Sequence, residues 1–126
     1  MVLVAVTKAD DRPIGFALSQ IHDRNLYMHQ LSVDPKHGRK GLGTALVQAV
    51  LGLAGDHKCN AVSLSTFRDI PWNGPFYLSL GFKEIPRKKL ADWMLDIEAE
   101  QAKALDITKR CFMWQPIKRS LMSRLG

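Results

Sequence analysis

The sequence predicts an α/β (α+β) fold, in which a mixed, largely antiparallel twisted sheet is flanked by helices. Three observations lead to this prediction. The first 33 residues read as three strands joined by short polar turns, which is typical of an antiparallel meander. The stretch 41–55 then places apolar residues three and four apart, as one buried helical face requires. A further strand at 61–66 follows, so the chain makes a strand–helix–strand crossover.

The elements are expected in the following order. Strands at 2–7, 14–22 and 26–33 are separated by the polar turns 9–13 and 23–25. The helix 41–55 is expected to bury Leu42, Ala45, Leu46, Ala49, Val50, Leu53 and Ala54. After the buried strand 61–66, a short helix at 73–80 ends at Gly81 as its C-cap, and a strand at 82–85, a helix at 90–104 and a strand at 110–117 complete the chain. The 126 residues are expected to form one domain, 1–126.

A glycine-rich stretch joins the strand 26–33 to the helix 41–55. Its residues are Gly38, Arg39, Lys40, Gly41, Leu42, Gly43 and Thr44. Glycines permit a tight turn and a close approach of ligand to backbone, and a helix N-terminus beside two cations suits a phosphate or pyrophosphate. The alternative is a plain turn with solvated basic residues. The stretch lacks the P-loop pattern, and Leu46 stands where a dinucleotide fingerprint needs its third glycine.

Three segments, taken in order, resemble the GNAT superfamily of acyl-CoA N-acyltransferases. They are Leu31-Ser32-Val33-Asp34-Pro35, the Gly41-Leu42-Gly43 turn, and Asn73 with Phe76-Tyr77 and Leu80-Gly81-Phe82. The stretch 71–77 is similar to the version found in a subset of bacterial members. The resemblance runs from about residue 2 to near 117. It differs at the front, where the family usually has a strand and one or two helices before the meander, so a GNAT-like fold truncated at the N-terminus is expected.

The resemblance implies an acetyl-CoA-dependent N-acetyltransferase that acts on a primary amine of a small molecule or a lysine-like acceptor. The pantetheine arm would bond to the main chain of the strand 26–33, and the loop 38–44 would hold the pyrophosphate. The implied cofactor-binding residues are Leu31, Ser32, Val33, Gly38, Arg39, Lys40, Gly41, Leu42, Gly43, Thr44, Asn73 and Phe76. Gly38 stands where the family usually has Gln or Arg. Asn73 is also a candidate helix N-cap.

Two residues are implied to be catalytic. Tyr77 matches the tyrosine that family members commonly use to protonate the coenzyme A thiolate, and its alternative role is packing on a short helix. His29 is the candidate general base, because 27–33 resembles the His-x-His strand of arylalkylamine acetyltransferases with Tyr27 in the first position. His22 on the neighbouring strand is expected close by, and a structural role is the alternative for His29. A backbone N–H near Leu31 would meet the oxyanion.

Composition narrows the remaining possibilities. The chain has 18 basic and 12 acidic residues and a net charge of +6, but its basic clusters at 36–40, 87–89 and 118–124 have no interleaved aromatic residues, which disfavours nucleic acid. Cys59 and Cys111 read as buried apolar residues, and no metal site is expected. The longest apolar runs are too short to span a membrane, so the cytoplasm is expected.

Three further expectations follow. The functional rival to the enzyme is a GNAT-fold module that binds or senses acyl-CoA without robust turnover. Trp72 and Phe67 are interpreted as core residues rather than as the lining of an acceptor pocket. The apolar edge strand left by the shortened front is expected to pair with another chain, so a homodimer is expected.

Overall fold

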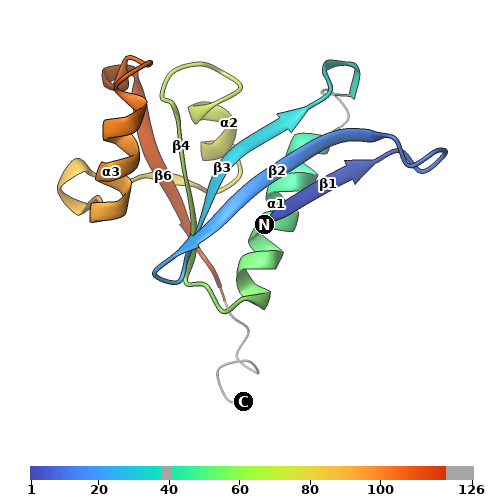
Figure 1. Ribbon diagram of the computed structural model, residues 1–126, viewed down its shortest axis with the longest axis horizontal. Helices are drawn as coiled ribbons and strands as arrows, with labels where there is room; N and C mark the ends of the chain where they lie inside the picture. Colours follow the sequence, from blue (N-terminus) through green and yellow to red (C-terminus); the bar gives the residue numbers. More distant parts are fainter. Residues whose placement is uncertain (38–40, 119–126) are drawn as a thin grey trace. The chain divides into compact units, whose positions relative to one another are not determined.

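The computed structural model describes residues 1–37 and 41–118 of the chain. Within these ranges six strands lie in the order β1-β2-β3-β4-β6-β5 (Figure 1). The elements are β1 (Val2–Val6), β2 (Pro13–His22), β3 (Asn25–Val33), α1 (Leu42–Asp56), β4 (Ala61–Phe67), α2 (Gly74–Ser79), β5 (Lys83–Glu84), α3 (Asp92–Gln101) and β6 (Arg110–Pro116). This mixed, mostly antiparallel sheet with flanking helices confirms the predicted fold class.

The chain divides into two compact units. One comprises Met1–Val62 together with Pro116–Gly126, and the other comprises Ser63–Gln115. The single domain 1–126 expected from the sequence remains a prediction.

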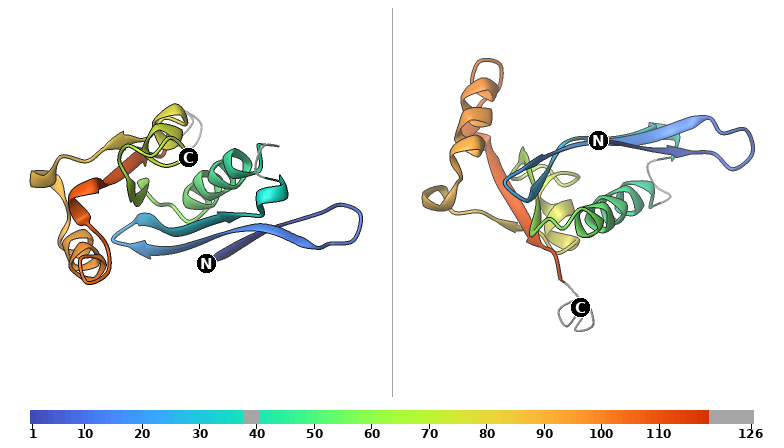
Figure 2. Two further views of the ribbon diagram at one scale, coloured as in Figure 1. Left: turned by 90° about the horizontal axis from the view of Figure 1, so that it is seen from above. Right: turned by 60° about the horizontal axis from the view of Figure 1, so that its bottom comes forward.

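In the first unit, α1 packs against one face of the β1-β2-β3 meander (Figures 1 and 2). Gly15 of β2 permits this close approach, because a Cβ there would lie 3.2 Å from the Leu46 side chain and 2.9 Å from the Ser32 carbonyl oxygen. The buried stripe of α1 is Leu46, Val47, Val50 and Ala54. Ala45 and Ala49, which the sequence predicted to be buried, are exposed. The buried face of α1 therefore includes Val47 in place of these two alanines. Exposure of an alanine costs little, because its side chain is small.

In the second unit, β5 and β6 pair antiparallel with Lys83 opposite Trp114, and the core includes Leu64, Phe82, Met94, Phe112 and Met113. The helix expected at 90–104 is shorter. Arg87–Lys89 forms a 3-10 turn and Ala91 is extended, so α3 begins only at Asp92. The Arg87 guanidinium donates two hydrogen bonds to the Glu98 carboxylate, at 3.0 and 2.5 Å, and so ties this turn to α3.

Two side observations complete the fold. Cys59 and Cys111 are both free and buried, as the sequence predicted, and burial raises the pKa of the Cys111 thiol to about 11. Among the helices of residues 1–37 and 41–118, none combines the length and apolar character that a membrane crossing would need.

Candidate active site

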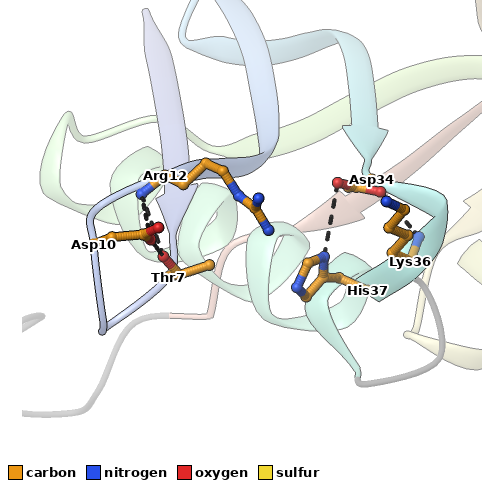
Figure 3. A network of polar contacts seen from close by, with 6 residues as sticks. All are labelled: Thr7, Asp10, Arg12, Asp34, Lys36 and His37. Atoms are coloured by element: carbon orange, nitrogen blue, oxygen red, sulfur yellow. Dashed lines mark hydrogen bonds and ion pairs between the residues drawn. The ribbon is translucent and has the colours of Figure 1, made fainter.

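The end of β3 leads into a tight, side-chain-supported turn. Leu31, Ser32 and Val33 are half-buried and lie opposite Ala17, Phe16 and Gly15 of β2. Asp34 then donates its N–H to the Ile14 carbonyl oxygen at 2.7 Å. Its carboxylate accepts the N–H of Lys36 at 2.9 Å, and its carbonyl accepts the N–H of His37 at 2.8 Å. These bonds fix the 3-10 turn Pro35–His37 (Figure 3), which directs the chain from β3 toward α1.

The turn between β1 and β2 is held by a second polar group. Asp10 accepts the hydroxyl of Thr7 and, at 3.3 Å, the backbone N–H of Arg12, so the chain reverses within six residues (Figure 3). The hydrogen bonds to Thr7 and Arg12 lower the pKa of the Asp10 carboxyl. These contacts order the loop between β1 and β2.

The N-terminus of α1 is suited to an anion. Gly41 occupies the N-cap with φ 75° and ψ 13°, a left-handed conformation that favours glycine. No side chain of the described residues caps this end, and the first intrahelical bond runs from the Ala45 N–H to the Gly41 carbonyl at 3.0 Å. The N–H groups of Leu42, Gly43 and Thr44 are thus the ones that a helix start leaves for other partners. The predicted residues Gly38, Arg39 and Lys40 lie outside the described residues.

A β-bulge at His29 is the most consequential local feature of β3. Leu18 lies opposite Gln30, but the next residue of β2, Ser19, lies opposite Met28, so His29 is the extra residue. In an unbroken strand His29 would share the α1-covered face with Leu31. The bulge instead brings it to the face that carries Gln30, and both side chains are exposed.

This face gathers a polar and aromatic cluster around His29. The His29 ring lies 4.8 Å from the Tyr27 ring, in a T-shaped contact, and 6.5 Å from the His22 ring, centroid to centroid. Its Nε2 is 3.2 Å from Oε1 of Gln20. Partial burial, the nearby His22 and the amino terminus together lower the pKa of His29 from its ordinary value of 6.5. His29 is therefore neutral at pH 7, and the expected proximity of His22 is confirmed.

In the second unit, Asn73 and Gly74 set the start of α2. Asn73 stands at the N-cap position, but its side chain makes no capping bond within the described residues. Its Oδ1 accepts the buried hydroxyl of Thr66 at 2.8 Å instead, so the predicted capping role of the side chain is wrong. Gly74 is required sterically, because a Cβ there would lie 2.9 Å from the Arg68 carbonyl carbon and closer still to its oxygen.

Tyr77 is fixed by the way α2 ends. Gly81 has φ 98°, its N–H bonds to the Leu78 carbonyl, and the Phe82 N–H bonds to the Tyr77 carbonyl, each at 3.1 Å. This is a Schellman motif, with glycine at the residue after the cap. The usual apolar contact is present as well, since the Tyr77 and Phe82 rings lie 5.7 Å apart. Phe76 contacts the other side, with centroids 5.1 Å apart.

The Tyr77 side chain is 7% exposed, and burial raises its pKa to about 12. The phenol therefore keeps its proton throughout the physiological range and has an O–H available to donate in a hydrogen bond. The ordinary pKa of a tyrosine is near 10, so burial makes Tyr77 a weaker acid than an exposed tyrosine.

The predicted site residues are thus divided between the units. His29, Leu31–Val33 and Leu42–Thr44 belong to the first, and Asn73, Phe76 and Tyr77 belong to the second. Sequence reasoning missed Gln20, because only the bulge brings His29 next to it. The interpretation of Trp72 as a core residue is wrong, since the side chain is 75% exposed, while Phe67 is half-buried with the Arg110 guanidinium 4.6 Å above its ring.

Known structures share this architecture. An acetyltransferase of the GNAT family from Staphylococcus aureus Mu50 superposes with a TM-score of 0.70 and 16% identity, over 93% of this chain and 67% of that one. N-acetylglutamate synthase from Neisseria gonorrhoeae, complexed with coenzyme A and N-acetyl-glutamate, superposes with a TM-score of 0.75 and 12% identity. The match covers 94% of this chain and 26% of that one. The ribosomal-protein-S18-alanine N-acetyltransferase from Escherichia coli superposes with a TM-score of 0.64 and 20% identity, over 90% of this chain and 67% of that one. At these identities the likeness shows the fold.

The family model that matches this chain defines the class of protein as an acyltransferase. Residues 2–82 match the model of the acetyltransferase (GNAT) family. Because this match covers more than half of the chain, the protein belongs to the GNAT family, as the resemblance in the sequence implied.

Proposed function

We propose that the protein transfers an acetyl group from acetyl-CoA to a primary amine of a small molecule or a lysine-like acceptor, by direct attack. The observation that carries this proposal is Tyr77, a buried phenol with a pKa of about 12 that stays protonated and is held in place from both ends of α2. Such a group is a hydrogen-bond donor for a developing thiolate.

The proposed cofactor contacts are those that the resemblance to the family implied. The main chain of Leu31, Ser32 and Val33 would bond to the pantetheine arm, as an added strand would. The pyrophosphate would lie at Gly38–Thr44, where the start of α1 offers N–H groups and a positive dipole end. Asn73 and Phe76 complete the set, and the Thr66 hydroxyl bound to Asn73 Oδ1 leaves the amide N–H₂ of Asn73 for the cofactor.

The chemical step requires a neutral amine. Neutral His29 removes a proton from the bound ammonium, the amine attacks the thioester carbonyl, and a backbone N–H near Leu31 stabilises the oxyanion. Burial leaves the Tyr77 phenol a weaker acid than the thiol that departs, so complete proton transfer from Tyr77 to the thiolate is uphill. Tyr77 therefore acts by donating a hydrogen bond to the departing sulfur. As the C–S bond breaks, the attacking nitrogen loses its second proton to solvent, and solvent supplies the proton that neutralises the thiolate.

Thermal denaturation with acetyl-CoA tests the binding part. Ligand at 100 times its Kd should add about 2.7 kcal/mol of stability and raise Tm. Gly43→Val should abolish the rise, because a branched side chain blocks approach to the first turn of α1. Gly52→Val is the matched control, because it makes the same substitution elsewhere in α1. At position 52 no atom of the described residues lies within 4 Å of an added Cβ. An unchanged Tm of the wild type with millimolar acetyl-CoA would refute the site.

Release of free coenzyme A in the presence of a panel of amines tests the reaction itself. A second candidate function is an acyl-CoA-binding module without robust turnover. In this module Tyr77 would serve packing alone, through its ring contacts with Phe76 and Phe82. A rise in Tm with acetyl-CoA, combined with no amine-dependent release of coenzyme A, would select this module over the enzyme.

A further inference from the structure

Gln20 has a defined relation to His29 that the sequence did not indicate. Gln20 lies opposite Tyr27 in the β2–β3 ladder, two pairs beyond the point where the register shifts. Because His29 is the extra residue of the bulge, its ring turns to the same face as the Gln20 side chain, and Nε2 and Oε1 come within 3.2 Å. The Tyr27 ring lies edge-on against the imidazole and restricts its rotation.

We propose that Gln20 is a positioning residue that holds His29 in the tautomer with a proton on Nε2, so that Nδ1 is the atom that accepts the proton of the acceptor amine. The proposal rests on the proposed function, in which His29 is the base. An amide oxygen can only accept a hydrogen bond, so its partner at Nε2 must be the N–H. The lone pair of neutral His29 is then on Nδ1.

The proton balance is simple. The N–H bond of the substrate ammonium breaks, its electron pair stays on nitrogen for the attack, and a new N–H bond forms at Nδ1. The resulting imidazolium still donates Nε2–H to Gln20 Oε1, now as a charge-assisted bond. Gln20 therefore supports both protonation states without changing its own. The proton leaves Nδ1 for solvent before the next turnover.

The neighbouring groups keep His29 neutral before the reaction. From β2 it faces His22, from β3 Tyr27, and from the start of the chain the Met1 ammonium, which bonds to the Ser19 carbonyl at 2.7 Å. The electrostatic effects of His22 and the Met1 ammonium both lower the pKa of His29. α1 packs on the opposite face of the meander. An added negative charge at position 20 should therefore have a large effect, because it opposes these influences at hydrogen-bond distance.

The experiment compares Gln20→Glu, Gln20→Leu and wild-type protein. Long-range ¹H–¹⁵N spectra of the imidazole rings report the tautomer and pKa of His29 without any substrate. The wild type should show the Nε2–H tautomer and a pKa below 6.5. Gln20→Glu should raise the pKa of His29 by about one unit, since an opposite charge within 4 to 6 Å stabilises the imidazolium. Gln20→Leu keeps the bulk but removes the acceptor, so it should lower the pKa of His29 and mix the tautomers.

The acidic limb of the kcat–pH profile should move with each NMR value, about one pH unit upward in Gln20→Glu. Gln48→Glu is the control, because it adds the same charge on an exposed position of α1 and should move neither readout. An Nδ1–H tautomer in the wild type, or an acidic limb that stays fixed while the pKa of His29 moves, would overturn the role of Gln20. Absence of any amine-dependent coenzyme A release by the wild type would instead refute the proposed function.

Discussion

The burial of Tyr77 makes a quantitative prediction about alkaline stability. Below pH 10 the phenol is neutral in both the folded and the unfolded chain, so its ionisation contributes nothing to the free energy of unfolding. Above pH 10 the unfolded chain releases the proton, whereas the folded protein retains it until about pH 12. The unfolded state is thereby favoured, and stability falls by about 1.4 kcal/mol per pH unit. Across the window from pH 10 to 12 this amounts to about 2.7 kcal/mol.

Tyr77→Phe removes this effect and little else. The ring contacts with Phe76 and Phe82 are retained, so stability at pH 8 should change by less than about 1 kcal/mol. Urea denaturation followed by tryptophan fluorescence at pH 8, 9.5, 10.5 and 11.5 gives the free energy of unfolding of both proteins. Above pH 10 the free energy of unfolding of the variant should rise progressively relative to that of the wild type. The effects of all other titrating groups cancel in this difference.

A difference in the free energy of unfolding between the two proteins that stays constant from pH 8 to 11.5 would refute the burial argument.

Turnover of Tyr77→Phe supplies a second measurement. Coenzyme A release should fall roughly 10²-fold in Tyr77→Phe while binding of acetyl-CoA persists, the range for losing one hydrogen-bond donor to the charge that develops in the transition state. Unchanged turnover would assign Tyr77 to packing alone.

Two other predictions concern packing and assembly. Gly74→Ala should destabilise the fold by about 3 kcal/mol, because its Cβ would overlap the Arg68 carbonyl. Gly52→Ala should add about 0.5–1 kcal/mol, since the described residues leave open space there; urea denaturation of both variants checks the contrast. Val2, Val4 and Val6 are exposed on β1, the first strand of the sheet order, so a homodimer is expected. Light scattering should give twice the 14.2 kDa chain mass, and a value near 14.2 kDa would contradict pairing.

Local signals made the elements predictable. Strand pairs separated by Asp-rich turns were located within one or two residues, because turn residues and apolar alternation act over short distances. Gly81 is the clearest case. Only glycine adopts the positive φ after α2 without strain, so a glycine at the end of an amphipathic stretch predicts the C-terminus of the helix. Trp72 could not be placed in this way, because an aromatic residue in a turn carries no periodic signal of burial.

The bulge marks the limit of sequence reasoning at the candidate site. Alternation from Tyr27 to Val33 assigns His29 to the same face as Leu31, and nothing in those seven residues predicts the slip. The slip depends on how β2 pairs with β3, and a one-residue change of register moves a side chain to the other face. The same holds for Asn73, whose amide bonds to Thr66, a residue on another element, rather than capping its own helix.

The two candidate catalytic groups have pKa values displaced in opposite directions, and this predicts the pH profile of the reaction. Burial holds Tyr77 protonated up to about pH 12, while partial burial and His22 keep the pKa of His29 below 6.5. Between these limits the hydrogen-bond donor Tyr77 and the base His29 are both in the form that the proposed reaction requires. With saturating amine, kcat should rise through the pKa of His29 and then stay level from about pH 7 to 10. His29→Gln should remove the acidic limb. A wild-type kcat that still climbs between pH 8 and 9 would show that the group deprotonated in the rate-limiting step is not His29, because a histidine with a lowered pKa has already lost its proton there.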